Sequence, residues 1–486
     1  MAPPLLPACM RQRTRVTQPS VAIDQPANGD LTFAGGTPAS VRGRIAWTFY
    51  EFAGGPYFVV VQIFVFASYF ANAVVIGDPV NGQAYWGYTG GIAGLLVALS
   101  SPFIGAIADK YGPRKPGIVL FTLLSLPFMA GLWLATPGSV VWAAACIIAT
   151  SLLFELGYIF HNAMLPAIAP ARRIGILSAA GYAMSYAGAM AAFGAWFALP
   201  ALGLGGGAEN GYAQERGAGL MAAAFAVVFL VPLVMMTPDV PRTGLSIGAC
   251  VREGVASLYG TIRKVGSYRN IVLFLVARMI YYDGLVAVFA FIGIYAASEF
   301  GWGQEVAIYG LLIIVTAAIS AVIGGLVDDA VGSKTTIMIS LVIFAVCLAA
   351  NLGTGPERIW YVVALTPDEA AAQLPLFGAL LAPIGFDRLP EQVFVLVGIL
   401  GGLFIGPALS SSRTLMARLA PPAQVAEFFG LYNLTGRATA FLAPAAIGLM
   451  TQASGDQRAG LGVIFIFIGV GFVLLTFVSE PRRPGR

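Results

Sequence analysis

Long apolar segments separated by short polar loops are the feature that most constrains how this chain can fold. Each is about long enough to cross a bilayer, which takes roughly 20 apolar residues per helix. Only 10% of the residues are charged and 58% are hydrophobic, whereas soluble domains carry about 25% charge. We therefore predict an all-α membrane protein with twelve transmembrane helices, at 46–75, 85–108, 117–136, 139–163, 177–200, 216–237, 270–297, 305–327, 335–352, 391–412, 425–450 and 460–479.

The predicted segments form two sets of six, separated by a polar, basic stretch. We predict an N-terminal six-helix bundle over 41–237, a cytoplasmic linker with an amphipathic surface helix over 238–269, and a C-terminal six-helix bundle over 270–480. Residues 1–40 are rich in Pro, Gly, Ala and Thr and lack the apolar core of a signal peptide. We expect them to form a disordered cytoplasmic tail, and residues 481–486 to form a short second tail.

The distribution of Lys and Arg predicts the orientation. Most of these residues lie in the tails and in alternate short loops, and such loops stay on the cytoplasmic side of a membrane. Both termini are therefore expected in the cytoplasm, which agrees with an even number of spans. Residues 353–390 then form an extracytoplasmic insertion, with a helix start at Thr366–Glu369. Its aromatic residues Trp360 and Tyr361 are expected to be interface anchors, with a binding site as the alternative.

A short signature occurs at the same place in each half, between the second and third segments. Residues 105–115 read GAIADKYGPRK, and residues 324–334 read GGLVDDAVGSK. Two halves built as a parallel repeat resemble the major facilitator superfamily, whose loop between helices two and three carries such a signature. The resemblance implies the major facilitator fold of two six-helix bundles and transport by alternating access.

The charged residues of the signature suggest a latch. Asp109 can accept hydrogen bonds from a helix N-terminus, while Arg114 and Lys115 can hold carboxylates on the cytoplasmic face. The alternative is that these cations only set the topology. Asp328 is the second-half counterpart of Asp109, in a loop with fewer basic residues. We therefore expect the first copy to hold the cytoplasmic side closed more strongly than the second.

Four stretches carry a closer resemblance, to the vacuolar amino-acid effluxer-like family and its bacterial relatives. They are Trp47–Tyr57, Asn162–Pro166, Ala277–Gly284 and Ser412–Pro444. The last joins an Arg at a helix end, a Pro-broken loop and a Gly-bearing helix entry. The resemblance implies secondary transport in the cytoplasmic membrane of a bacterium, with export of a small solute such as an amino acid.

Ionisable side chains inside the apolar segments are the functional candidates, because their burial costs several kcal/mol unless they face a wet cavity or a partner. Most lie in the first, fourth, seventh and tenth segments, which line the central cavity in the major facilitator fold. The candidates for the substrate or coupling site are Glu51, Glu155, Tyr158, Asn162, Arg278, Tyr282 and Asp283. The gate or latch candidates are Asp109, Arg114, Lys115, His161, Asp328, Arg413 and Arg437.

Three of these candidates suggest a mechanism. A pair between Glu51 and Arg278 would tie the two halves on the cytoplasmic side and break when that side opens. His161 is the only histidine and could carry a coupling proton, although a bonded structural histidine is the alternative. Glu155 shares a helix face with Tyr158 and Asn162, which suits either ligand binding or packing against neighbouring helices.

Several functional classes are excluded. The chain has no phosphate-binding Gly-Lys-Ser/Thr loop and no His/Cys cluster, so we expect neither an enzyme nor a cofactor or metal. A net charge of +4 is too small to argue for nucleic acid. We predict a monomeric secondary transporter surrounded by lipid that exports a small solute, with a proton or sodium as coupling ion. The alternatives are a proton- or sodium-coupled sugar importer and a non-transporting scaffold or sensor.

Overall fold

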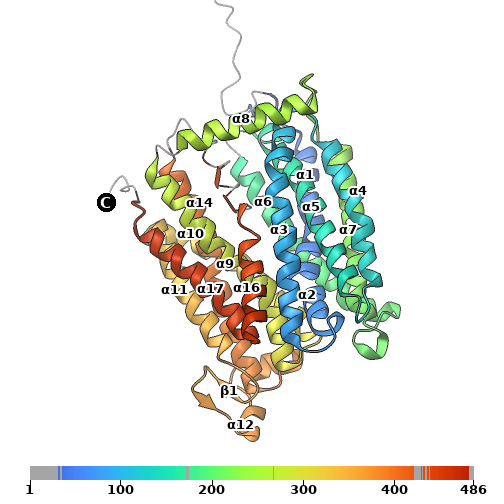
Figure 1. Cartoon of the computed structure of the whole chain (residues 1–486), viewed down its shortest axis with the longest axis vertical. Coiled ribbons are helices and arrows are strands. Elements are labelled where there is room, and N and C mark those ends of the chain that lie inside the picture. Colours follow the sequence, from blue (N-terminus) through green and yellow to red (C-terminus); the bar gives the residue numbers. More distant parts are fainter. Residues whose placement is uncertain are drawn as a thin grey trace, which may run out of the picture.

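The computed structural model describes residues 31–32, 36–170, 174–265, 268–420, 428, 431–432, 435–436 and 438–480. Most of the predicted N-terminal tail and the whole of 481–486 lie outside these residues. The described chain is almost entirely helical, and its long helices run side by side along the longest axis (Figure 1). Helix α8, Ile247–Val265, lies across one end of this bundle, within the predicted linker.

The first half contains six long helical segments. The first segment is the continuous series α1, η1, α2 and η2. Short 3₁₀ turns follow the fifth segment, at Leu199–Leu202 and Ala208–Asn210. The elements are α1 Val41–Gly55, η1 Pro56–Phe64, α2 Val65–Tyr69, η2 Phe70–Val74, α3 Pro79–Lys110, α4 Lys115–Gly131 with η3 Leu132–Leu134, α5 Val140–Ile168, α6 Ile174–Ala198 and α7 Ala213–Met236.

The second half repeats this plan and adds the insertion. Its long elements are α9 Arg269–Phe300, α10 Glu305–Val331, α11 Ser333–Leu352, α14 Leu389–Leu419, α16 Leu442–Ser454 and α17 Gln457–Thr476. The insertion contains β1 Arg358–Ile359 and β2 Val363–Ala364, which pair antiparallel, followed by α12 Pro367–Ala371, α13 Gly378–Leu381 and η7 Ala382–Ile384.

Ten helices among the described residues are long and apolar enough to cross a membrane. Helix α10, with 27 residues, and helix α16, with 13, occupy the places of the predicted eighth and eleventh segments. The prediction of twelve spans is therefore consistent with the structure. In the insertion, the predicted helix start is confirmed, because Thr366 is the N-cap of α12 and forms a reciprocal capping box with Glu369.

The first transmembrane segment is wound irregularly because Pro56 interrupts it. Proline has no backbone N–H to donate, and its ring would clash with the carbonyl four residues earlier. The helix continues from Pro56 as a π-helix, a form often found at functional sites. Gly55 lies against Ser185 of α6, where a Cβ would come within 2.7 Å of the Ser185 carbonyl oxygen. The Gly54-Gly55-Pro56 sequence therefore both loosens the helix and lets α1 and α6 pack closely.

The two ends of the bundle carry different elements. The linker face carries α8 and the loop between α3 and α4, and the insertion face carries β1, β2 and α12 (Figure 1). Near the insertion face, side chains join the two halves: Gln83 donates to Thr451 Oγ1 over 2.8 Å, and Ser298 donates to Asn72 Oδ1 over 2.6 Å. The halves are therefore tied together at the insertion face.

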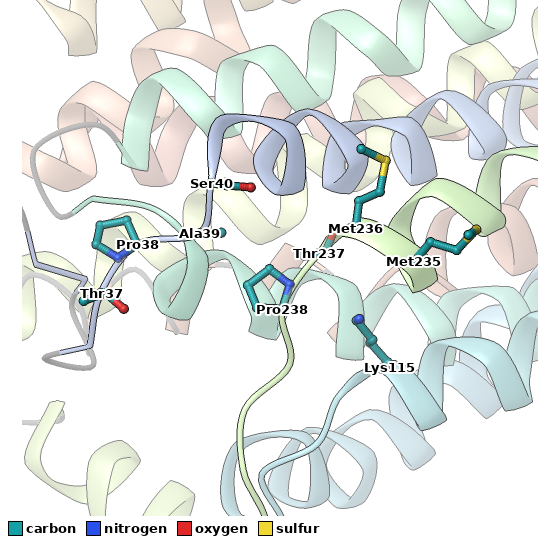
Figure 2. A pocket seen from close by; sticks show the side chains of 9 residues that line it. All are labelled: Thr37, Pro38, Ala39, Ser40, Lys115, Met235, Met236, Thr237 and Pro238. Atoms are coloured by element: carbon teal, nitrogen blue, oxygen red, sulfur yellow. The ribbon is translucent and has the colours of Figure 1, made fainter.

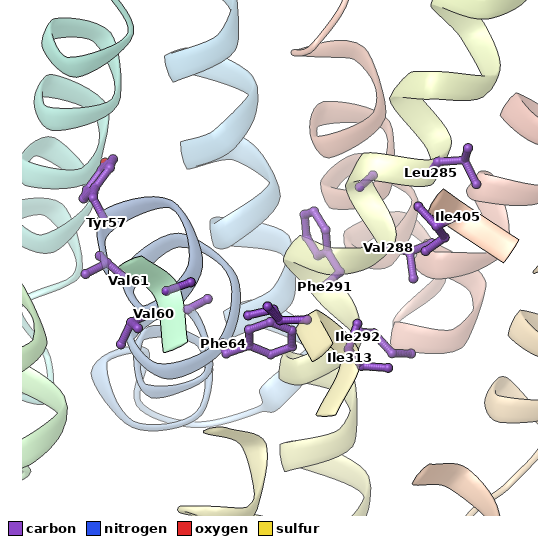
Figure 3. Packing of buried hydrophobic residues seen from close by; sticks show 14 of the residues in the cluster. Tyr57, Val60, Val61, Phe64, Leu285, Val288, Phe291, Ile292, Ile313 and Ile405 are labelled. Atoms are coloured by element: carbon purple, nitrogen blue, oxygen red, sulfur yellow. The ribbon is translucent and has the colours of Figure 1, made fainter. Parts of the chain in front are cut away.

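Apolar packing continues this contact toward the middle of the bundle. Phe64 of η1 lies between the halves, near Phe291 of α9 (Figure 3), and its ring packs on Gly310 of α10. Helix α3 packs on α16 in the same way, with Gly91 beside Ala445. Small residues at these positions let the backbones approach, as is usual for helices in membranes.

Candidate functional site

His161 and Trp47 hold α5 and α1 together through two reciprocal hydrogen bonds. The Trp47 indole N–H donates to the His161 carbonyl over 3.1 Å, and His161 Nε2 donates to the Trp47 carbonyl over 3.0 Å. The two rings are stacked 4.4 Å apart, with only 6° between their planes. His161 is fully buried, and its Nδ1 lies 3.5 Å from Glu51 Oε1. The structure thus brings two predicted site residues, Glu51 and His161, together.

Arg278 of α9 is buried between two tyrosine rings. Its guanidinium carbon lies 3.5 Å from the ring centre of Tyr432 and 4.7 Å from that of Tyr282. Arg278 Nη1 donates to the Tyr432 carbonyl over 2.7 Å, while Nε is buried and has no hydrogen-bond partner among the residues that the structure describes. Within the described part of the chain Arg278 makes no ion pair, so the predicted pair with Glu51 is not formed in this conformation.

Asp283, also on α9, is buried at the start of α16. The backbone N–H of Ala443, in the first turn of α16, donates to its carboxylate. The other carboxylate oxygen, Oδ2, is buried and finds no hydrogen-bond partner in the described part of the chain. Because a helix N-terminus attracts negative charge, this position suits a carboxylate. Among the described residues, Asp283 and Arg278 form no ion pair with each other.

The remaining cavity candidates occupy different environments. Tyr158 is buried beside Tyr50, and its hydroxyl donates to the Tyr50 carbonyl over 3.3 Å. Glu155 is partly buried, whereas Asn162 and Arg413 are exposed. Tyr282 is partly buried and covers one face of the Arg278 guanidinium. The two rings of Tyr282 and Tyr432 are called the Arg278 cage below. Arg437 lies outside the described residues.

The first signature loop is bound to the end of the sixth span. Asp239 accepts the backbone N–H of Arg114 over 2.9 Å and that of Lys115 over 3.0 Å. The Lys115 amine donates to the Val234 carbonyl over 2.8 Å. Burial lowers the pKa of Arg114, while the nearby carboxylates of Asp109 and Asp239 act in the opposite direction. The first signature loop thus rests on α7 and the segment that follows it, within its own half.

The second signature loop is bound in the same way, and more extensively. Glu480 accepts the N–H groups of Ser333 and Lys334, as Asp239 does in the first half. Asp328 is buried, accepts from the Ser333 hydroxyl and pairs with Arg418 over 2.9 Å. Sequence reasoning missed Arg418 and Glu480. The position of Glu480 just after the last span, matching Asp239 after the sixth, is a signal that could have found it.

A hollow of about 540 Å³ opens on the linker face, apart from the buried charges. It lies at the start of α1 and the end of α7, as Figure 2 shows. Lys115 is the only charged residue among those lining it, and its amine is already bound to Val234. The lining residues are Thr37, Pro38, Ala39, Ser40, Lys115, Met235, Met236, Thr237 and Pro238. The hollow therefore lacks the convergent polar groups expected of a substrate site.

Comparison with known proteins identifies the family. The model of the vacuole effluxer Atg22-like family matches residues 68–484. The chain belongs to this family. An uncharacterized MFS-type transporter of Bacillus subtilis, YxiO, is 25% identical over 450 residues, which cover 90% of this chain and 94% of that protein. Autophagy-related protein 22 of Cryptococcus neoformans is 35% identical over 124 residues, but this match covers only 25% of this chain and 22% of that protein.

Solved structures show the same fold. A D-xylose-proton symporter superposes with a TM-score of 0.63 at 12% identity, covering 90% of this chain and 96% of that one. A POT family transporter in complex with 5-aminolevulinic acid gives 0.61 at 14% identity, covering 93% and 99%. The predicted major facilitator fold is thereby confirmed. This Atg22-like protein is a multi-pass membrane transporter of the major facilitator type.

Proposed function

We propose that this protein is a secondary active transporter that exports a small solute bearing a carboxylate, such as an amino acid. The observation that carries the proposal is the caged guanidinium of Arg278, buried inside a membrane-spanning helix with no ion pair among the described residues. A buried cation is costly unless it has a partner. A substrate carboxylate would be such a partner.

The chemistry of the cage suits this role. Guanidinium groups bind carboxylates through two parallel hydrogen bonds, and they stack on aromatic rings. In Arg278, Nη1 is used by the Tyr432 carbonyl, while Nε is buried and available. Tyr282, which covers one face of the guanidinium, is only partly buried. Glu51 or Glu155 on the other half could hold the amino group of the same substrate.

The residues that join the halves support alternating access. In this conformation they are tied at the insertion face, which we place outside the cytoplasm. In the opposite conformation we expect Glu51 of α1 to approach Arg278 of α9 and to close the linker face. Arg278 would then exchange a substrate carboxylate for that of Glu51, so that substrate release and closure of the linker face are coupled.

Flux in proteoliposomes tests the proposal. Thermal-shift screening of the purified protein against amino acids, other carboxylates and sugars selects the solutes. Each stabilising solute is then assayed for movement under a pH or sodium gradient of either sign, which separates export from import. We expect a carboxylate-bearing solute to move and Arg278→Gln to abolish the movement. Movement of uncharged sugars alone, or full activity of Arg278→Gln, would contradict the assignment.

A further inference from the structure

We propose that Glu51 and His161 share one bound proton, which makes the proton the coupling ion of this transporter. This inference rests on the proposed transport function and names its driving ion. Its geometric basis is the 3.5 Å distance between His161 Nδ1 and Glu51 Oε1. Neither atom can supply a hydrogen to the other when His161 is neutral and Glu51 is ionised.

The backbone fixes which ring nitrogen of His161 carries a hydrogen. Nε2 lies 3.0 Å from the Trp47 carbonyl oxygen, which can only accept a hydrogen bond. Nε2 must therefore be the donor, so in the neutral ring Nδ1 carries a lone pair. The stacked indole of Trp47 and its own bond to the His161 carbonyl hold the ring in this orientation. A ring flip would break the bond to Trp47.

Nδ1 consequently presents a lone pair toward a carboxylate oxygen. His161 is fully buried and its Nδ1 has no hydrogen-bond partner, whereas the Glu51 side chain is 17% exposed. An unpartnered buried acceptor is unfavourable, and two facing acceptors repel. One added proton removes both penalties, because it gives either an imidazolium beside a carboxylate or a carboxylic acid that donates to Nδ1. The proton can enter through Glu51, the exposed member.

The described groups around the pair come from α1, α4, α5 and α6. From α1 and α5 the neighbouring titratable residues are Tyr50 and Tyr158, whose rings lie 4.8 and 5.7 Å from that of His161, and Glu155, whose charge reaches Tyr50. Helix α4 contributes Thr122, which is bonded to Tyr50. Helix α6 presents Gly181 against Trp47 and Glu51. Among the described residues, His161 Nδ1 and Glu51 Oε1 are the two acceptor atoms that face each other, and a single proton fits between them.

Loss of the proton is expected to move the Glu51 carboxylate away from His161. A deprotonated Glu51 and the Nδ1 lone pair repel each other, so the carboxylate leaves His161. Glu51 lies just before the glycines and proline that loosen the first span, which permits such a movement. Arg278 of the other half is the partner expected to receive it. Proton release thus favours closure of the linker face, and proton binding favours the conformation described here.

Nitrogen NMR of the single histidine tests the proposal without any substrate. The sequence contains one histidine, so protein purified without a polyhistidine tag and labelled with ¹⁵N-histidine reports His161 alone. We expect the Nδ1 resonance to move with pH through one transition as the shared proton binds and leaves. Glu51→Gln should abolish this movement, because its carboxamide N–H donates to Nδ1 at every pH. Asp78→Asn, an exposed acid-to-amide control, should titrate like the wild type.

Two results would overturn the proposal: an Nδ1 resonance independent of pH in the wild type, or Glu51→Gln that titrates unchanged. If Glu51→Gln does not fold, the wild-type titration still decides. Trp47 fluorescence gives a second readout, since a protonated ring stacked at 4.4 Å quenches the indole, and subtraction of Trp47→Phe isolates its signal. A titrating pair without flux would refute transport but not proton binding. Flux without a titrating pair would refute only the proton site.

Discussion

Asp328 and Arg418 form an ion pair in the second half, with 2.9 Å between Oδ1 and Nη2. Arg418 also lies 2.7 Å from Glu480 and donates to Ser333, so one arginine joins α10, α11, α14 and the segment after α17. Asp109, the first-half counterpart of Asp328, is exposed and makes no ion pair within the described residues. The two halves thus use the same signature with different partners.

Asp328→Asn is expected to destabilise the protein more than Asp109→Asn. Removal of the Asp328 charge weakens its partly buried contact with Arg418. We expect this to lower the free energy of unfolding by about 1–3 kcal/mol. The Arg418 side chain is 24% exposed, so solvent keeps the loss below that of a fully buried pair. Thermal unfolding in detergent measures the difference. Equal melting temperatures for the two variants would show that the pair contributes little.

A separate prediction concerns which of the two predicted latches holds the cytoplasmic side closed more strongly. The sequence alone favours the first copy, because its loop has more basic residues. It therefore predicts that Asp109→Asn opens the cytoplasmic side more than Asp328→Asn does. The structure shows that Arg418 and Glu480 strengthen the second copy. This weakens the reason for expecting the first copy to be the stronger one. Cysteine accessibility in the two variants decides it, and equal labelling contradicts the asymmetry.

Gly188→Ala is expected to separate α1 from α6. A Cβ at Gly188 would overlap the Phe52 carbonyl, and overpacking of this kind costs about 1–3 kcal/mol. Gly105→Ala is the matched control, because a Cβ there meets nothing within 4 Å. Alanine is the better helix former by about 1 kcal/mol, so the control should be neutral or stabilising. Thermal unfolding of both variants checks this, and equal effects would argue against close packing at Gly188.

Arg278→Lys is expected to lower transport at least about tenfold although it keeps the charge. The lysine ammonium cannot stack between Tyr432 and Tyr282 or offer two parallel hydrogen bonds. Arg358→Lys is the control, because Arg358 also faces a tyrosine ring but lies on the insertion hairpin. Initial rates of solute flux measure the effect. If both variants keep wild-type rates, the cage has no role in substrate binding.

The sequence predicts the helical membrane fold because lipid demands long apolar segments, and these are visible without any partner. It also points to α5 and α9 as helices that carry buried ionisable groups, whereas its candidate Arg413 is exposed. It cannot predict the partners, because they come from other helices. Arg278 is caged by Tyr432 from another part of the second half, and His161 is fixed by the backbone of Trp47. The pattern of apolar and polar residues within one helix gives no information about either contact.

A reversible cross-link between the halves tests alternating access most directly. At Gly91 a Cβ would lie 3.0 Å from the Ala445 Cβ, so cysteines at both positions need only a small shift to reach the about 3.5–4.5 Å of a disulfide. The native cysteines, Cys9, Cys146, Cys250 and Cys347, are first replaced by alanine. The single variant Gly91→Cys is the control.

The measurement is solute flux in proteoliposomes that contain Gly91→Cys/Ala445→Cys, before and after reduction of the disulfide. Because α3 and α16 belong to different halves and are packed together, we expect rocking of the halves to move them relative to each other. We therefore predict that oxidation stops flux, that reduction restores it, and that the single variant is unaffected by either treatment. Undiminished flux through the fully cross-linked protein would contradict the account, because the halves could then not alternate around a central site.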